Sequence, residues 1–309
     1  MNRKQLVKGY VVTVLSAVIF GCMPMMAKFI YSDGVNSLSL VLLRNLLSLP
    51  VAGLIAFSRN RSLRIPVKAV PQLATIGFVG CCLTPTLLFS SYFFIASGTA
   101  TVFHFAYPAV VVLGAPLLFR ERLTAGNLIS VLVCVAGVAL FYTPGQPLDW
   151  RGSALALLSS VTFAAYVLLL SRFRYKQLDG YLLNFYIFGF NVISMLAACS
   201  LTGMLTLPTS LGSWLGCFLF AFLTNVMATA MFQQGTFLIG GQKASILSTL
   251  EPITGVVMGI LVFREAVSLR TALGAVLVIL AGVLIVMFDV HEQKKQAAKD
   301  SCDCPADVV

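Results

Sequence analysis

The chain has 309 residues, of which 59% are hydrophobic and only 10% are charged, and its mean hydropathy is +0.93. A soluble globular domain is about 25% charged, so this composition excludes a water-soluble fold that covers its surface with polar side chains. The net charge of +10 does not indicate nucleic-acid binding, because the basic residues lie in short connections between apolar segments, as in proteins that use them to fix orientation in a membrane.

Apolar segments of about twenty residues recur along the chain, and each is long enough to cross a hydrocarbon core of roughly 30 Å. The first follows a basic start without a convincing cleavage site, so we interpret it as an uncleaved span. The sequence therefore predicts an all-α polytopic membrane protein with ten transmembrane helices. The expected spans are 10–31, 37–57, 71–95, 99–118, 124–142, 152–171, 181–201, 213–238, 244–262 and 269–288.

The distribution of basic residues supports ten spans with a cytoplasmic N-terminus. Of the 21 lysines and arginines, only Arg151, Arg264 and Arg270 then fall outside, and Lys28 and Arg44 fall within spans. All the others are cytoplasmic, which is the bias that sets the orientation of membrane proteins. We expect an integral plasma (inner) membrane protein with a cytoplasmic N-tail, 1–9, and a disordered cytoplasmic C-tail, 289–309.

The motif "LLFRER" at 117–122 returns as "LVFREA" at 261–266, and Pro108 aligns with Pro252 at the same offset of 144 residues. Weaker matches extend outward, so the chain divides into two five-helix halves, 10–142 and 152–288. Because five is odd, the second copy enters the membrane from the opposite side. Inverted repeats of this kind recur in secondary transporters, whose substrate site lies at the repeat interface. The alternative is an old duplication that serves only packing.

With two five-helix halves and a helix ending in "P…LLFRE" or "EPITGVVMGILVFRE" in each, the chain resembles the drug/metabolite transporter (DMT) superfamily, EamA type, over about 10–288. The resemblance implies ten helices, a central cavity and export or exchange of small metabolites. One departure concerns the acid before the second proline: Glu251 has Tyr107 as its first-half counterpart. An ion-coupling role for Glu251 would therefore belong to one half only.

Two charged residues lie well inside predicted spans, where each costs at least about 2.5 kcal/mol on insertion scales. Glu251 shares a face with small residues and is expected to point into the bundle, either as an ion-coupling carboxylate or as the partner of a buried base. Arg44 is expected either to bind a substrate carboxylate or to pair with Glu251 or a backbone carbonyl.

Uncharged polar and aromatic side chains complete the candidate substrate-binding set. His104 and Tyr107 share a face of the fourth span, and Asn225 and Gln233 belong to a polar stripe on the eighth. Each could line a cavity or serve as a hydrogen-bonded structural residue. Two aromatic residues, Phe20 and Tyr166, are candidates for the cavity wall, although aromatic residues in spans more often only pack.

The sequence favours a carrier that exports or exchanges small metabolites, such as amino acids, by alternating access, with protons as the candidate coupling ion. A channel, a lipid scramblase or a non-transporting membrane protein remains the alternative. An enzyme is not expected, because the chain has only two histidines and neither H-E-x-x-H nor G-x-S-x-G. We expect no cofactor and no metal site. The oligomeric state is left open, a monomer included.

Overall fold

The computed structural model describes residues 3–60, 62–95, 97–119, 124–140, 149–175, 178–263 and 269–302. All regular elements in these ranges are helical. Seven helices are long and apolar enough to cross a membrane, and two shorter apolar helices, Ala125–Ala139 and Ala272–Ile285, accompany them. The prediction of an all-helical membrane protein is therefore confirmed. The repeated arginine–glutamate pairs, 120–121 and 264–265, lie outside the described residues.

The helices follow the predicted spans in chain order, but several spans are interrupted. The first half comprises α1 (Arg3–Gly21), α2 (Met23–Tyr31), α3 (Ser37–Asn60), η1 (Val67–Ala69), α4 (Val70–Gly77), η2 (Phe78–Leu83), α5 (Thr84–Ser91), α6 (Ser97–His104), α7 (Tyr107–Phe119) and α8 (Ala125–Ala139). The second comprises α9 (Trp150–Ser171), α10 (Gly180–Thr202), α11 (Leu211–Phe220), η3 (Ala221–Thr229), α12 (Ala230–Ile239), α13 (Gly241–Leu247), η4 (Ser248–Leu250), α14 (Glu251–Phe263) and α15 (Leu269–Cys302).

Two breaks occur at positions that the repeat relates to each other. The segment expected as one helix over 99–118 divides into α6 and α7, and the segment expected over 244–262 divides into α13, the 3₁₀ turn η4 and α14. Pro108 and Pro252 lie just after these breaks. Proline has no N–H to donate to the carbonyl four residues earlier, and its ring clashes with that carbonyl. The same residue therefore interrupts the same helix in both halves.

Two π-helical segments also occupy related positions, η2 in the third helical run and η3 in the eighth. At the end of each, a threonine hydroxyl donates a hydrogen bond to the carbonyl five residues earlier: Thr84, directly after η2, to Val79 at 2.8 Å, and Thr229, the last residue of η3, to Thr224 at 2.9 Å. A π-turn widens the helix and is commonly found at functional sites. Both segments border the cavity described below.

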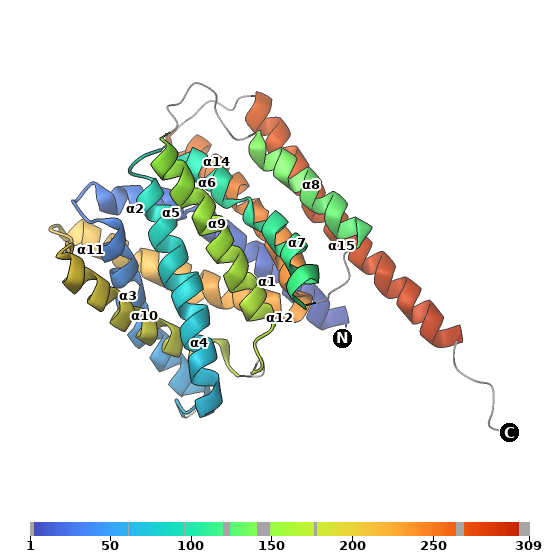
Figure 1. Cartoon of the computed structure of the whole chain (residues 1–309), viewed down its shortest axis with the longest axis horizontal. Coiled ribbons are helices and arrows are strands. Elements are labelled where there is room, and N and C mark those ends of the chain that lie inside the picture. The colour runs from blue at the N-terminus through green and yellow to red at the C-terminus, as the bar shows by residue number, and fades with distance from the viewer. Residues whose placement is uncertain are drawn as a thin grey trace.

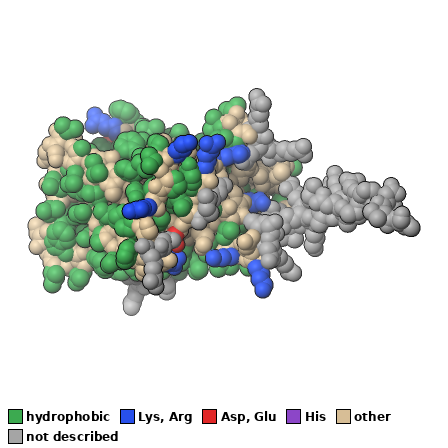
Figure 2. All heavy atoms as spheres, turned by 90° about the horizontal axis from the view of Figure 1, so that it is seen from below, with side chains coloured by type: hydrophobic (Ala, Val, Ile, Leu, Met, Phe, Trp, Pro, Cys, Tyr) green, Lys and Arg blue, Asp and Glu red, His purple; other side chains and the backbone are tan. Residues whose placement is uncertain are grey.

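The two halves interlock rather than lie side by side as separate domains (Figure 1). Helix α3 packs along α10, and α8 packs along α15 at one edge of the molecule. The other close pairs are α1 with α12 and α5 with α9. Figure 2 shows hydrophobic side chains over much of the outer surface, as expected where lipid replaces water.

Glycines allow the closest helix pairs to approach. At Gly9 in α1, an added Cβ would lie 2.6 Å from Ile239 Cγ2, and at Gly235 in α12 it would lie 2.0 Å from Thr13 Oγ1. Small residues that let backbones approach are typical of membrane helix interfaces, where lipid supplies no hydrophobic driving force between helices. The α1–α12 contact, which joins the two halves, therefore depends on the absence of side chains at these positions.

One carboxylate ties together the connections at one end of the bundle. Asp33 follows α2 and accepts hydrogen bonds from the Thr209 hydroxyl at 2.7 Å, the Thr209 N–H at 2.7 Å and the Ser210 N–H at 3.1 Å. The Thr209 hydroxyl, followed by these two N–H groups, lowers the pKa of Asp33 to about 2. The α2–α3 connection of the first half is thus held to the α10–α11 connection of the second.

The last helix is longer than expected. The C-tail, expected to be disordered from residue 289, continues α15 as helix to Cys302, and residues 303–309 lie outside the described part. The segment "HEQKKQAAK" consists mainly of residues with favourable helix propensity, so it extends a helix that packing has already nucleated.

We expect Gly235→Leu to lower the melting temperature of the detergent-purified protein by several degrees, because the new side chain must displace Thr13 and separate α1 from α12. The matched control is Gly212→Leu in α11, where the nearest atom to an added Cβ is Ser210 Oγ at 4.0 Å. Differential scanning fluorimetry measures both. Equal melting temperatures for the two variants would contradict the assigned close contact.

Candidate functional site

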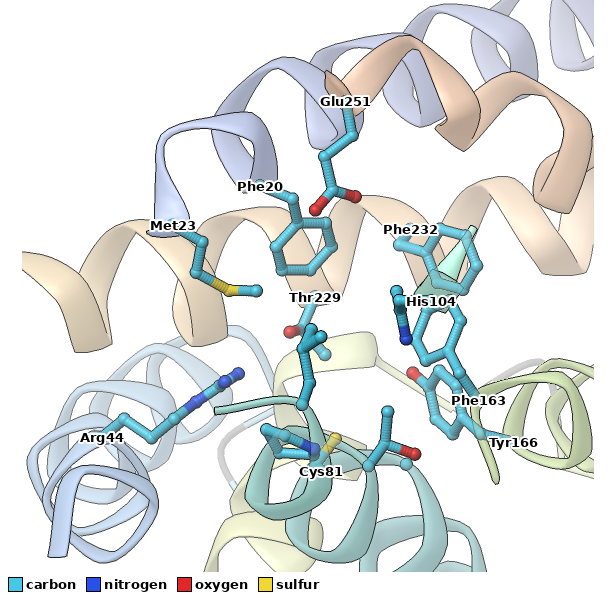
Figure 3. A pocket seen from close by; sticks show the side chains of 14 residues that line it. Phe20, Met23, Arg44, Cys81, His104, Phe163, Tyr166, Thr229, Phe232 and Glu251 are labelled. Atoms are coloured by element: carbon cyan, nitrogen blue, oxygen red, sulfur yellow. The ribbon is translucent and has the colours of Figure 1, made fainter. Parts of the chain in front are cut away.

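A cavity with a free volume of about 60 Å³ lies between the two halves, at the level of the helix breaks and π-helical segments. Both halves contribute to its lining. The lining residues are Phe20, Met23, Arg44, Gly80, Cys81, Thr84, Pro85, Leu88 and His104 from the first half, and Phe163, Tyr166, Thr229, Phe232 and Glu251 from the second. Among these fourteen residues, only Arg44 and Glu251 carry opposite formal charges, and Figure 3 shows their side chains reaching toward the same space from different sides.

Arg44 is held by the second half of the chain. Its Nε donates to Asn225 Oδ1 at 2.8 Å, and its Nη2 contacts the same oxygen. The Asn225 amide donates back to the Arg44 carbonyl at 3.1 Å, and the guanidinium lies 5.7 Å from the centre of the Phe220 ring. A buried cation needs acceptors, and a single amide oxygen leaves several of the five guanidinium N–H donors for another partner.

Glu251 begins α14 directly after η4, and its side chain points into the cavity (Figure 3). Among the described residues it makes no side-chain hydrogen bond and no ion pair; the ion pair found there joins Arg59 and Asp179 at 3.4 Å. The structure thus assigns Arg44 to Asn225 instead of the expected alternatives, Glu251 or a backbone carbonyl. The site presents one cationic and one anionic group to the cavity without pairing them.

Aromatic rings form the wall between these groups. Phe163 is central: its ring centre lies 5.4 Å from that of His104, 5.5 Å from Tyr166 and 5.8 Å from Phe232. His104 Nδ1 is 2.9 Å from Ser159 Oγ, and the imidazole is 7% exposed. Flat apolar walls with two charged poles suit a small ligand that has both polar ends and a hydrophobic body.

Five of the eight candidate residues from the sequence line the cavity, and three lie behind it. The lining candidates are Phe20, Arg44, His104, Tyr166 and Glu251. Asn225 holds Arg44 from behind, and Gln233 Nε2 donates to the Tyr166 hydroxyl at 3.4 Å. Tyr107 packs edge-on against Phe163, with ring centres 4.7 Å apart, and bonds α13 and η4.

The sequence reasoning did not assign the part of the wall that η2 and the start of α5 supply. Gly80 shows why: an added Cβ there would lie 2.0 Å from the Tyr166 ring, so the glycine makes room for a side chain from the other half. A glycine with no repeat-related partner inside an apolar span was the available signal.

Comparisons with known proteins give a consistent result. The profile of the EamA-like transporter family matches residues 7–143 and again residues 150–287. A protein of Clostridium kluyveri named "Uncharacterized transporter" is 20% identical over 293 residues, covering 90% of this chain and 92% of the relative. A protein of Archaeoglobus fulgidus with the same name is 26% identical over 281 residues, covering 90% of this chain and 95% of the relative.

Two further comparisons concern a third relative and a solved structure. An "Uncharacterized inner membrane transporter" of Salmonella typhimurium is 26% identical over 211 residues, covering 65% of this chain and 67% of the relative. A crystal structure superposes with a TM-score of 0.76 at 16% identity, covering 93% of this chain and 98% of the other. At that identity the superposition shows a shared fold.

We expect Asn225→Leu to destabilise the protein by about 1–3 kcal/mol, because it leaves the buried Arg44 guanidinium without its acceptor. Adding Arg44→Met should recover most of this loss, because removing both polar partners leaves no unpaired buried charge. Reversible unfolding in mixed detergent micelles measures both variants. A double variant as unstable as Asn225→Leu alone would show that the Arg44–Asn225 pair is not the cause.

Proposed function

The chain belongs to the EamA-like transporter family, and from this premise we propose a secondary-type carrier that exports or exchanges small metabolites by alternating access. The observation that supports this most strongly is the cavity, which both halves line. Arg44 and Glu251 face it among aromatic rings without forming an ion pair with each other. We propose ligands that carry a carboxylate and an ammonium group, as amino acids do. The carboxylate would meet Arg44, and the ammonium group would meet Glu251.

We further propose that ten spans form two inverted five-helix repeats, 10–142 and 152–288. The packing supports this, because replacing each helix by its counterpart in the other half leaves the pattern of helix contacts nearly unchanged. The α3–α10 and α8–α15 contacts are converted into themselves, and the α1–α12 contact is converted into the α9–α5 contact. The proline breaks and π-helical segments exchange likewise. Repeats related in this way can adopt two arrangements around a fixed site, in which the two halves exchange their conformations. We call the arrangement reached by this exchange the mirrored state.

The proposed orientation places both termini in the cytoplasm, following the bias of basic residues toward the side of the N-terminus. The proposed location is the plasma (inner) membrane, which the name of the Salmonella relative supports. Protons as a coupling ion, bound at Glu251, are part of the same proposal. Catalysis and a cofactor have no part in it.

We expect detergent-purified protein to gain thermal stability with at least one neutral amino acid, and less with the matching amine or deaminated acid, because binding to the folded state stabilises it by mass action. That amino acid should then drive counterflow, in which internal unlabelled ligand accelerates uptake of external label into proteoliposomes. A channel or a non-transporting protein would show no such acceleration. Uptake that is indifferent to internal ligand would therefore contradict a carrier.

In the same assay, Glu251→Gln should slow counterflow about 10-fold or more, the equivalent of one charge-assisted hydrogen bond. Lys28→Gln is the matched control, because this change also removes one charge from a helix but at an exposed position on α2. The melting temperature of each variant separates transport from folding. Equal counterflow in both variants would remove Glu251 from the site.

Repeat-related positions should face opposite sides of the membrane. We expect Ser62→Cys, after α3, to react with a membrane-impermeant maleimide only in permeabilised cells, and Met204→Cys, after α10, to react in intact cells. Cys302→Ser and Cys304→Ser in the background remove the tail thiols. Labelling of both positions from one side would overturn the inverted arrangement.

A further inference from the structure

One hydrogen-bonded contact joins the two broken helical runs beside the cavity. The Tyr107 hydroxyl, at the start of α7, donates to the Ser245 carbonyl at 3.3 Å and is bonded to Ser248 Oγ. Tyr107 is 1% exposed, and α7 packs against α13 along this contact. In the proposed orientation this contact lies on the cytoplasmic side of the cavity.

Exchanging the repeats converts this contact into a different pair of side chains. At the offset that aligns Pro108 with Pro252, Tyr107 exchanges with Glu251, and Ser248 exchanges with His104. In the described structure Glu251 and His104 both line the cavity and share no hydrogen bond, and His104 Nδ1 contacts Ser159 Oγ instead. The outer counterpart of the inner contact is therefore unformed.

We propose that in the mirrored state the Glu251 carboxylate accepts a hydrogen bond from the His104 imidazole. This contact closes the outer side of the cavity, as the contact between Tyr107 and Ser248 closes the inner side here. This rests on the proposed function, since it requires two mirrored states. It gives Glu251 and His104 a second, state-dependent role as positioning residues that hold α14 against α6.

Buried oxygens without partners support the exchange independently. In this structure Ser16 Oγ and Thr236 Oγ1 are fully buried and unpartnered. Ser16 is the counterpart of Ser159, so the His104–Ser159 bond at 2.9 Å becomes a Ser248–Ser16 bond in the mirrored state.

A second exchange accounts for the other oxygen. Thr236 is the counterpart of Tyr92, whose hydroxyl is bonded to Thr101. In the mirrored state this becomes a Thr236–Ser245 bond. An unsatisfied buried hydroxyl is costly, so both orphans favour a second arrangement that supplies their partners.

The contact that closes the inner side and the contact proposed to close the outer side differ in chemistry. The two states of the carrier are therefore not equivalent. The inner contact joins uncharged hydroxyl groups, whereas the outer one uses the carboxylate that also faces the ligand. A ligand ammonium group at Glu251 therefore competes with His104 for the carboxylate, and the outer side closes most readily around an empty site or around a ligand that leaves one carboxylate oxygen available.

Paired cysteines test the contact in full-length protein in proteoliposomes, with the eight native cysteines replaced by serine or alanine. One variant carries His104→Cys with Glu251→Cys, another Tyr107→Cys with Ser248→Cys, and a third carries all four. A short bifunctional thiol reagent is added, the number of internal crosslinks is measured by intact mass, and the linked pair is identified by mass spectrometry of proteolytic peptides. We expect both pairs to crosslink, and each four-cysteine molecule to hold one crosslink and not both.

The proposal fails if the His104/Glu251 pair gives no more crosslink than the single-cysteine variants while the Tyr107/Ser248 pair reacts. It fails too if both crosslinks form in one molecule. Absence of both crosslinks removes the contact from which the inference starts, and overturns it as well. The wild-type protein, without crosslinker, is assayed for counterflow in parallel. If it shows counterflow while the crosslinking results contradict the proposed contact, the contact fails and the proposed carrier function stands.

A second test changes Ser16, which is not among the residues that line the cavity. Ser16→Ala removes a hydroxyl that has a partner, Ser248, only in the mirrored state, so it should lower the yield of the His104/Glu251 crosslink about 3- to 10-fold in the two-cysteine variant that retains Ser248, the equivalent of one net hydrogen bond. Ser130→Ala is the matched control, because Ser130 Oγ is also buried and unpartnered here but lies in α8, outside the exchanged contacts. Equal crosslink yields in the two variants would overturn the proposal.

Discussion

The constraint on which this structure depends is that lipid offers a polar group no hydrogen-bond partner, so a polar group at membrane depth is costly unless the protein supplies one. A continuous helix satisfies its own backbone N–H and C=O groups, so none of them is left to bind a ligand. Pro108 and Pro252 lie at interruptions of this backbone hydrogen bonding at related places in the two halves. The π-helical segments η2 and η3 alter the hydrogen bonding of two further helical runs at the same level. The cavity lies where the helices are least regular because a polar site requires exposed donors and acceptors there.

The same constraint explains how two charges are kept in the centre of an apolar bundle. Arg44 comes from one half and its acceptor Asn225 from the other, so neither half satisfies the guanidinium by itself. The pairing couples folding to assembly of the halves. It also keeps Arg44 from neutralising Glu251 directly, which would leave the cavity with a buried salt bridge and little to offer a dipolar ligand.

Much of this architecture could be predicted from sequence because hydropathy, basic connections and the repeat are all one-dimensional signals. The described helices occur in the expected order, and seven of them are long and apolar enough to cross a membrane, against ten expected spans. Five of the candidate residues, Phe20, Arg44, His104, Tyr166 and Glu251, line one cavity between the halves. Family membership follows from the same repeated motif, which the profile match over both halves confirms.

What could not be predicted depends on the rotation of one helix against another. Arg44 and Asn225 were both singled out, yet their pairing was not foreseen, because the π-turn of η3 changes which side of the helix faces α3. Gly80 was passed over for a similar reason, since its importance comes from the Tyr166 ring packed on it from the other half.

The difference between the halves is where function must arise, because a perfectly symmetric carrier would treat the two sides of the membrane alike. At the break that both halves share, one carries a phenol and the other a carboxylate, and one carries an imidazole where the other carries a hydroxyl. In the proposed cycle, the two halves exchange conformations between two shapes. The substitutions Tyr107 for Glu251 and His104 for Ser248 then make the free energies of the two shapes respond differently to the charge of a bound ligand. Such a difference lets the two sides of the membrane bind and release the ligand with different affinities, while the gradients of the ligand and of any coupled ion set the net direction of transport.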